Sequence, residues 1–255
     1  MHMDQMPRKM SVTLFIPVKN EREALQVIMP RLSYDWFDEL LILDGNSTDG
    51  SKELLVSQGY PVIVQKTRGI KAAFWEAFEM ARGDVIIPFS PDGNSIPEDI
   101  PKLVEKINEG YDIVVASRYR DKTASGDDDF VSHLANCWFT GLINILFRTH
   151  YTDGIGMYKA FKKQHLYDLG IDRHKDEHSE IMLLTRGARY GLKITEISSP
   201  EPARIGVQGS RAHPGVFGKY KSAFILLKSI LRDAIFYHPA REKQINADVS
   251  RMRHL

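Results

Sequence analysis

The chain of 255 residues has little cysteine and no long apolar run. Its one cysteine, Cys137, excludes an internal disulfide and a cysteine-rich zinc site. No apolar stretch reaches the ~18–20 uninterrupted residues that a membrane-spanning helix needs. Residues 1–9 also lack the apolar core of a secretion signal. We therefore expect a cytoplasmic protein, with residues 1–10 as a disordered leader.

An excess of charge of one sign is also missing. Lysine and arginine together number 34 and aspartate and glutamate 33, so the formal net charge is +1. Such a balance gives no support for nucleic-acid binding. Hydrophobic residues make up 43% of the chain, which excludes a disordered protein and is enough, at this length, for a full core.

Common phosphate-binding and hydrolytic fingerprints are absent as well. The sequence has no G-x-x-x-x-G-K-[ST] loop and no G-x-G-x-x-G after the first predicted strand. It has no G-x-S-x-G elbow and no H-E-x-x-H pair. These absences argue against P-loop enzymes, dehydrogenases, elbow-type hydrolases and zinc proteases.

Strand and helix patterns alternate over the first 120 residues. Strands are predicted at 12–16, 40–43, 62–65, 84–89 and 112–117, and helices at 21–32, 48–57, 70–81 and 97–108. This alternation indicates an α/β fold, a mostly parallel sheet flanked by helices. Because ligands of such sheets bind beyond the carboxyl ends of the strands, the residues that follow each strand are the candidates for function.

The pattern changes after residue 120. We expect an acidic loop at 121–130, a Gly-rich segment at 151–161, a Pro- and Gly-rich loop at 198–218, helices at 131–148, 179–190 and 216–237, and a strand at 193–197. No internal repeat or low-complexity tract is present. A single domain over 11–237 is therefore expected, with 238–255 as a tail.

Carboxylates follow two of the predicted strands. Asp44 ends one strand, and Asp92, with Asn94 two residues on, follows another. A hard divalent cation that carries a diphosphate needs only a few protein oxygens and open positions for substrate. Asp92 and Asn94 can supply them. The alternative is that Asp92-Gly93 only makes a turn.

Five sequence blocks occur in the order and spacing of a known family. The blocks are Ile-Pro-Val-Lys-Asn-Glu at 16–21, Leu-Ile-Leu-Asp-Gly-Asn-Ser-Thr-Asp-Gly at 41–50, the stretch from Arg-Gly at 68 to Ala-Arg-Gly-Asp ending at 84, Pro-Phe-Ser-Pro-Asp-Gly-Asn at 88–94, and Ser-Arg-Tyr at 117–119. With them the chain resembles the family 2 glycosyltransferases of the GT-A fold, in particular the dolichyl-phosphate mannose synthase-like branch. The resemblance implies a nucleotide-sugar-binding half at 11–120, an acceptor half at 121–215 and an amphipathic helix at 216–237.

The resemblance also implies roles for individual residues. Asp92, with Asn94, would hold Mg²⁺ or Mn²⁺ on the donor diphosphate, and Arg118 would meet the acceptor or a phosphate. The donor, a UDP- or GDP-linked sugar, would be bound by Pro17, Glu21, Asp44, Arg68, Gly69, Ser90, Arg204, Ser210 and Arg211. Ser90 is a departure, because the family has aspartate there as the first residue of D-x-D. A hydroxyl is a weaker metal ligand, so this position leaves open a nucleotide-sugar-binding protein without turnover.

Glu180 has two possible roles. Glu180, Arg186 and Gly191 keep the spacing of a family stretch in which a carboxylate is the general base for an acceptor hydroxyl. Where the acceptor is already an anion, little deprotonation is needed, and Glu180 would be a structural partner. A metal cluster of Glu180's neighbours His174, Glu177 and His178 is disfavoured against a solvated helix start.

The acceptor half resembles the lipid-phosphate branch. Residues 151–161 are similar to its D-x-T-S-G-F-R-x-Y motif, with Lys159 in place of the arginine. The 216–237 helix gathers Phe217, Tyr220, Phe224, Leu227, Leu231 and Ile235 on one face, with lysines and arginine elsewhere. Such a helix suits an anionic membrane surface. The alternative is that it packs on the domain or at a homodimer interface.

These observations predict a metal-dependent, inverting transfer of a sugar to a polyprenyl phosphate at the cytoplasmic membrane face. One alternative is transfer to a sugar hydroxyl of a growing glycan. Another is nucleotide-sugar binding without catalysis. A nucleotidyltransferase is disfavoured because residues 18–21 lack the Gly-rich loop of that class.

Overall fold

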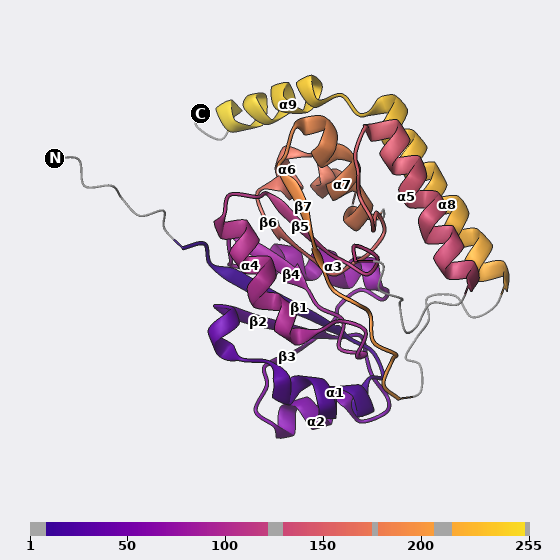
Figure 1. The fold of residues 1–255 in the computed structure, drawn as a ribbon. Coiled ribbons are helices and arrows are strands. Elements are labelled where there is room, and N and C mark those ends of the chain that lie inside the picture. Colours follow the sequence, from indigo (N-terminus) through magenta and orange to yellow (C-terminus); the bar gives the residue numbers. More distant parts are fainter. Residues whose placement is uncertain (1–8, 122–129, 175–177, 207–215, 253–255) are drawn as a thin grey trace.

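The structure, a computed structural model, describes residues 9–121, 130–174, 178–206 and 216–252. Its strands form one sheet in the order β3-β2-β1-β4-β6-β5-β7 (Figure 1). They are β1 (Val12–Val18), β2 (Glu39–Asp44), β3 (Val62–Val64), β4 (Val85–Pro88), β5 (Ile113–Ser117), β6 (Lys159–Lys162) and β7 (Ile194–Ser198). All pairings are parallel except those of β6, which runs antiparallel to β4 and β5. The expected mostly parallel sheet is confirmed.

Helices cover both faces of this sheet. The helices are α1 (Arg22–Ile28), α2 (Ser51–Ser57), α3 (Ile70–Met80), α4 (Ile100–Asn108), α5 (Phe130–Phe147), α6 (His165–Asp168), α7 (Ser179–Tyr190), α8 (Val216–Phe236) and α9 (Pro239–Met252). Side chains of α1, α2 and α4 pack into one core cluster, and those of α3, α6 and α7 into a second one on the opposite face. The three-layer arrangement follows from strands that are apolar on both sides.

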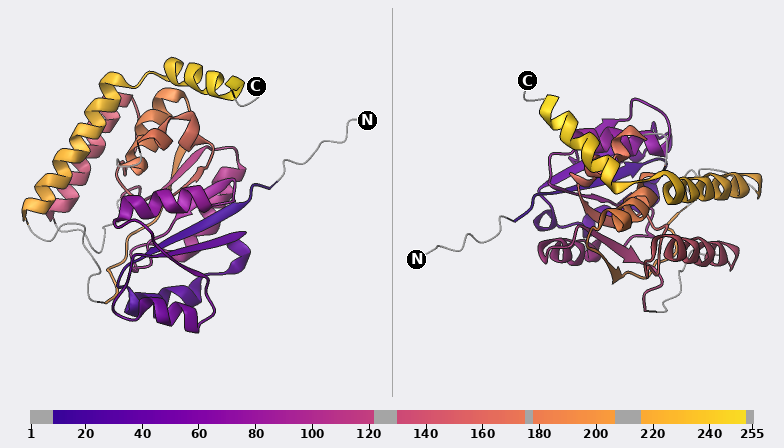
Figure 2. Two further views of the ribbon diagram at one scale, coloured as in Figure 1. Left: turned by 180° about the vertical axis from the view of Figure 1, so that it is seen from behind. Right: turned by 90° about the horizontal axis from the view of Figure 1, so that it is seen from above.

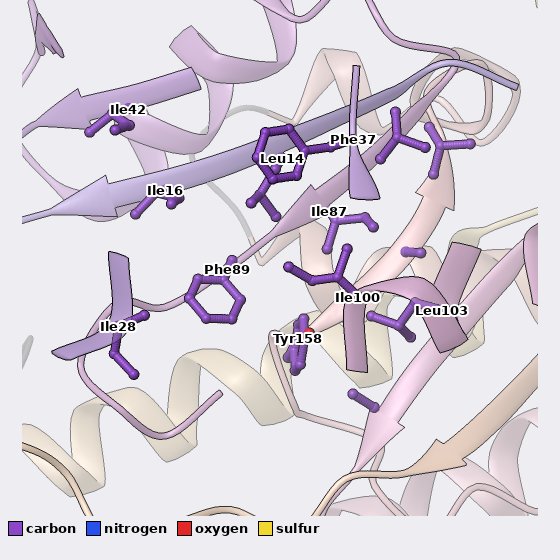
Figure 3. Close-up of a cluster of buried hydrophobic side chains, with 14 of the residues drawn as sticks. Leu14, Ile16, Ile28, Phe37, Ile42, Ile87, Phe89, Ile100, Leu103 and Tyr158 are labelled. Atoms are coloured by element: carbon purple, nitrogen blue, oxygen red, sulfur yellow. The ribbon is translucent and has the colours of Figure 1, made fainter. Parts of the chain in front are cut away.

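Strand β1 illustrates why the sheet is buried on both faces. Its side chains alternate, so Leu14 and Ile16 join the cluster under α1 and α4 (Figure 3) while Phe15 joins the one under α3. These three side chains are 0% exposed. Each fully buried side chain of this size contributes about 1.5–3 kcal/mol to folding.

Most predicted elements agree with the structure to within a few residues, and the 179–190 helix matches α7. The helix expected at 21–32 was too long, because α1 ends at Ile28 and Met29–Arg31 is a 3-10 helix. Pro30 lacks an N–H and would clash with the carbonyl of Gln26 in a continued α-helix. The segment expected as a tail contains helix α9. Residues 1–8 of the expected leader and 122–129 of the expected acidic loop lie outside the described residues.

Strand β6 was not predicted. The 151–161 segment reads as a Gly-rich loop, yet its last residues enter the sheet between β4 and β5. Phe161 pairs with both Ile86 and Ile113, and Lys159 pairs with Val115. This insertion brings the motif that precedes it to the centre of the sheet, close to the ends of β4 and β5.

Helices α5 and α8 extend along one side of the domain (Figures 1 and 2). They pack against each other and α7 through a third cluster that contains Phe139, Ile143 and Ile230. Their other sides carry exposed apolar residues: Val131, Leu134, Trp138 and Ile145 on α5, and Phe224, Leu231, Ile235 and Phe236 on α8. Among the described residues, no helix is long and apolar enough to cross a bilayer.

A buried ion pair fixes α8 to α7. Arg186 Nη2 lies 3.0 Å from Asp233 Oδ1, and Thr185 Oγ1 donates to Asp233 Oδ2 at 2.9 Å. Arg189 donates to three backbone carbonyls at the end of α8. The predicted family position Arg186 therefore serves helix packing here.

Candidate active site

The loops after β1 and β2 are tied together at the carboxyl edge of the sheet. Asn20 N donates to Ser47 Oγ at 3.0 Å, and Thr48 N donates to Asn20 Oδ1 at 2.8 Å. Asp44 ends β2, is 1% exposed, and accepts the Ser47 amide at 3.1 Å. This network holds the predicted nucleotide residue Asp44 in a fixed turn beside the end of β1, where Val18 is its partner in register.

Asp92, in the turn after β4, contacts the segment that follows β7. Arg204 Nη1 is 3.4 Å from Asp92 Oδ2, and Ile205 N donates to the Asp92 carbonyl at 2.9 Å. Asn94 N donates to Asp92 Oδ1 at 3.1 Å. Three of the residues predicted for the donor site are thus brought together from two segments more than 100 residues apart in sequence.

Gly93 makes this contact possible. Its φ of +93° is one that side-chain-bearing residues rarely adopt, and a Cβ there would lie 2.8 Å from Ile205 Cγ1. Glycine therefore lets the 204–206 segment pack directly on the turn that carries Asp92.

Glu21 lies near Asp92, and together with Asn94 and Arg204 these residues form what we call the Asp92 cluster. Burial, followed by the nearby carboxylate of Asp92, raises the pKa of Glu21 to about 7, and Arg204 acts in the opposite direction. Two carboxylates and one guanidinium therefore share this site. The arrangement has a local excess of negative charge that a cation would relieve.

Arg118 follows β5 and is held by Asp153. Its Nε and Nη2 lie 2.7 and 3.0 Å from the two carboxylate oxygens of Asp153, and Nη1 lies 3.5 Å from Glu201 Oε2. Burial alone would raise the pKa of Asp153, but hydrogen bonds and charge from Arg118 hold it below its usual range. Glu201 also accepts from Asn94 Nδ2 at 3.1 Å, which links Arg118 to the Asp92 cluster.

Glu180 stands apart from the Asp92 cluster, in the first turn of α7. Its Oε1 lies 2.7 Å from His178 Nδ1. Burial would raise the pKa of Glu180, but the bond and charge of His178 lower it, so the carboxyl is ionised near neutral pH. His178 is therefore a partner of Glu180 at the start of α7, where its side chain is partly exposed. Glu177 lies outside the described residues.

One hollow lies beside the donor residues and a second, which shares part of its lining, lies beside Glu180. The first is lined by Pro17 and Ser90 together with Phe89, Ser95 and Tyr158. The second is lined by Lys159, Ser179 and Glu180 together with Phe78, Phe161 and Leu183. Phe74, Pro88 and Met157 line both. The two predicted halves of the site therefore share a wall.

Four further residues, Arg68, Gly69, Ser210 and Arg211, were predicted for the donor site. Arg68 and Gly69 are exposed in the loop before α3, whose hydrogen bonds go to Gln65 and Glu76. Ser210 and Arg211 lie outside the described residues. Sequence reasoning did not find Asp153 and Glu201 as partners of Arg118 and Asn94, because both pairings join segments far apart in sequence. It also did not find the pairing of His178 with Glu180, although the two residues are neighbours at the start of α7.

The Asp92 cluster fits a hard divalent cation. It offers the carboxylate of Asp92 and the amide of Asn94, with Glu21 adjoining, and Mg²⁺ bound to substrate phosphates needs only one or two protein carboxylates. In the described part of the chain, no group of three or more His, Cys, Asp or Glu side chains is placed to hold a metal alone. A cation here would therefore depend on substrate oxygens.

Comparison with solved structures establishes the fold. Glucosyl-3-phosphoglycerate synthase from Mycobacterium tuberculosis, in complex with Mn²⁺, UDP and phosphoglyceric acid, superposes with a TM-score of 0.66 at 18% identity, over 89% of this chain and 79% of that one. Mannosyl-3-phosphoglycerate synthase from Rubrobacter xylanophilus gives 0.60 at 16% identity, over 88% and 73%. The predicted GT-A fold is confirmed.

Relatives identified by sequence carry polyprenyl-phosphate transferase names. An undecaprenyl-phosphate 4-deoxy-4-formamido-L-arabinose transferase of Pseudomonas fluorescens is 36% identical over 42% of this chain and 35% of its own length. The dolichol-phosphate mannosyltransferase of Pyrococcus furiosus is 37% identical over 43% of this chain and 34% of its own. Glycosyltransferase AglJ of Haloferax volcanii is 27% identical over 75% and 63%. The matches thus cover from about a third to under two thirds of these relatives.

The family model of Glycosyl transferase family 2 matches residues 13–170. This range holds β1 to β6, and with them Asp44, Asp92 and Arg118. Because the match covers more than half of the chain and the fold agrees with it, the protein belongs to glycosyltransferase family 2 and is a glycosyltransferase of the GT-A fold.

Proposed function

We propose that the protein transfers a sugar, with inversion and with Mg²⁺ or Mn²⁺, from a UDP- or GDP-linked donor to a polyprenyl phosphate. The observation that carries the proposal is the Asp92 cluster, in which Arg204, Glu21 and Asn94 surround one carboxylate at the carboxyl edge of the sheet. The polyprenyl phosphate is supported by the names of the Pseudomonas and Pyrococcus relatives.

Each part of the cluster has a task in binding the donor. Asp44 and Pro17, at the ends of β2 and β1, border the place for the nucleotide. Arg204 presents a planar set of donors to diphosphate oxygens, which guanidinium groups bind with two parallel hydrogen bonds. A divalent cation on Asp92 and Asn94 would neutralise charge on the leaving diphosphate.

Arg118 serves the acceptor side. Asp153 holds the guanidinium through two of its nitrogens, so that the edge bearing Nη1 is directed toward Glu201 and the Asp92 cluster. A fixed guanidinium at this edge can orient an acceptor phosphate against the donor without the entropic cost of ordering a flexible side chain.

A membrane surface is the source of such an acceptor. The exposed residues Val131, Leu134 and Trp138 on α5 and Phe224 and Ile235 on α8 present apolar side chains next to the acceptor half. Lys228, exposed between Phe224 and Leu231, adds a cation that anionic lipid attracts. We propose peripheral contact of this surface with the cytoplasmic membrane face.

Calorimetric titration with UDP and with GDP, with and without Mn²⁺, tests the donor site. We expect metal-dependent binding of one nucleotide, lost in Asp92→Asn and kept in Asp35→Asn, an exposed carboxylate outside the site. Absence of binding by either nucleotide to the native protein would contradict the proposal. Binding without sugar transfer to any acceptor would favour the nucleotide-sugar-binding protein that Ser90 leaves open.

Transfer to a sugar hydroxyl is the second candidate function, favoured by the ionised Glu180 beside His178. Glu180→Gln removes a general base. At saturating donor, we expect it to abolish transfer to a hydroxyl and largely to spare transfer to a phosphate. Assays of the variant with a polyprenyl phosphate and with a glycan acceptor therefore distinguish the two.

A further inference from the structure

Lys159 is a buried cation whose hydrogen-bonding capacity is mostly unused by the residues that the structure describes. It lies on β6 and is 1% exposed. Its Nζ donates to the Glu180 carbonyl at 2.8 Å, its one hydrogen bond within the described ranges. An ammonium group has three N–H donors. Because a buried charge is costly unless its donors are satisfied, the remaining two point to a ligand.

The fold dictates where this ammonium lies. Side chains alternate along β6, so Lys159 shares a face with Phe161, under the start of α7. There it lines the second hollow together with Ser179 and Glu180, among the apolar side chains of Phe74 and Met157. Burial lowers the pKa of Lys159 to about 8, and the charge of Glu180 acts against that shift, so the ammonium form predominates at pH 7.

The hollow adjoins the donor site. Phe74, Pro88 and Met157 line it and also line the hollow that reaches Ser90, two residues before Asp92. A group attached to a diphosphate at Asp92 would extend from Ser90 along this shared wall toward Lys159 and Glu180. In a nucleotide-diphosphate sugar, that group is the sugar to be transferred.

The two polar groups select a hydroxyl over a phosphate. The ammonium of Lys159 only donates hydrogen bonds, and the ionised carboxylate of Glu180 only accepts them. A hydroxyl does both, whereas a phosphate would be repelled by the carboxylate. We propose that Lys159 and Glu180 together bind one hydroxyl of the sugar that is transferred.

The inference rests on the proposed function, because it requires a nucleotide-sugar donor at Asp92. It also gives Glu180 a role in the reaction with a phosphate acceptor, for which no base is needed. His178, 2.7 Å from Glu180, then positions the carboxylate toward the sugar.

Calorimetric titration tests the inference. The protein, with its divalent cation present, is titrated with UDP-glucose and GDP-mannose and, for comparison, with UDP and GDP. We expect Lys159→Met to weaken binding of the nucleotide sugar by about tenfold and to leave the nucleoside diphosphate unchanged, because a charge-assisted hydrogen bond to the sugar is lost. Lys163→Met is the matched control. Lys163 Nζ also donates to a backbone carbonyl, that of Ala81, but does not line the hollow.

Two further outcomes would overturn the inference. One is native-like binding of nucleotide sugar to Lys159→Met; the other is a change confined to the KM of the acceptor, which would assign the hydroxyl to the acceptor. If Lys159→Met does not fold, Glu180→Gln takes its place, with the same comparison of sugar and nucleotide. If no nucleoside diphosphate binds the native protein, the proposed function itself fails.

Discussion

Arg118 and Asp153, 35 residues apart in sequence, form a two-point ion pair in which Nε and Nη2 meet the two carboxylate oxygens at 2.7 and 3.0 Å. The Asp153 side chain is fully buried and also accepts from Asn136 Nδ2 and Gly156 N. The pair therefore joins the end of β5, helix α5 and the segment that leads into β6.

Arg118→Met should destabilise the fold strongly. It leaves the Asp153 carboxylate buried without its cation, which costs about 3–5 kcal/mol of unfolding free energy. Arg82→Met is the control, because Arg82 is 86% exposed in its pair with Glu39, and such pairs contribute below about 1 kcal/mol. Urea denaturation measures both. Equal, small effects would show that Arg118 is not needed to hold Asp153.

Gly93→Ala should loosen the contact of the 204–206 segment with Asp92. Alanine at φ +93° is strained by about 1–3 kcal/mol, and its Cβ would press on Ile205. Gly59→Ala is a matched control, since Gly59 has φ +83° but nothing within 4 Å of an added Cβ. We expect Gly93→Ala to lose more stability in urea and to weaken nucleotide binding. A Gly93→Ala protein that matches Gly59→Ala in both would contradict the contact.

Glu21 makes stability depend on pH in a defined direction. Its pKa is raised from 4.5 to about 7 in the folded state. The stability that its protonation contributes is therefore fully present below about pH 4.5 and is lost as pH rises through 7. The full shift would be about 3 kcal/mol, which solvent screening at this half-buried group reduces to about 1 kcal/mol. Glu21→Gln should therefore raise the Tm at pH 8 and not at pH 4. An equal change at both values would assign the effect to packing.

Trp138 reports on the proposed membrane surface. It is 55% exposed on α5, whereas Trp75 is 7% exposed in the core. In a protein that keeps Trp138 but carries Trp36→Phe and Trp75→Phe, emission should shift to the blue on addition of phosphatidylglycerol vesicles. Phosphatidylcholine vesicles should give a smaller shift, since cations such as Lys228 favour anionic lipid. A shift that depends on protein concentration without vesicles would indicate a homodimer instead.

Much of the donor side could be predicted from the sequence, because the strands are short apolar runs and turn residues follow them. Asp44 and Asp92 were placed at strand ends by that pattern, and both lie there. The partner of each side chain could not be predicted. Arg204 reaches Asp92 only because the segment after β7 contacts the turn after β4, which no local pattern encodes.

The acceptor side was harder to predict for a different reason. β6 is four residues with lysine at each end, and a buried lysine gives no apolar periodicity. Helix α9 has a polar sequence and is held in place by contacts such as the ion pair of Arg173 with Glu242. In both places tertiary contacts override the local signal.

The insertion of β6 has a consequence for how the chain is synthesised. β5 leaves the ribosome before β6 but has only β6 and β7 as sheet neighbours. Until residue 162 has emerged, β4 and β5 each present open hydrogen-bonding edges, which are sites for mispairing between nascent chains. The central sheet therefore closes late and through distant partners, so folding should be slow for a chain of this size. Truncation near residue 120 would trap that open-edged state.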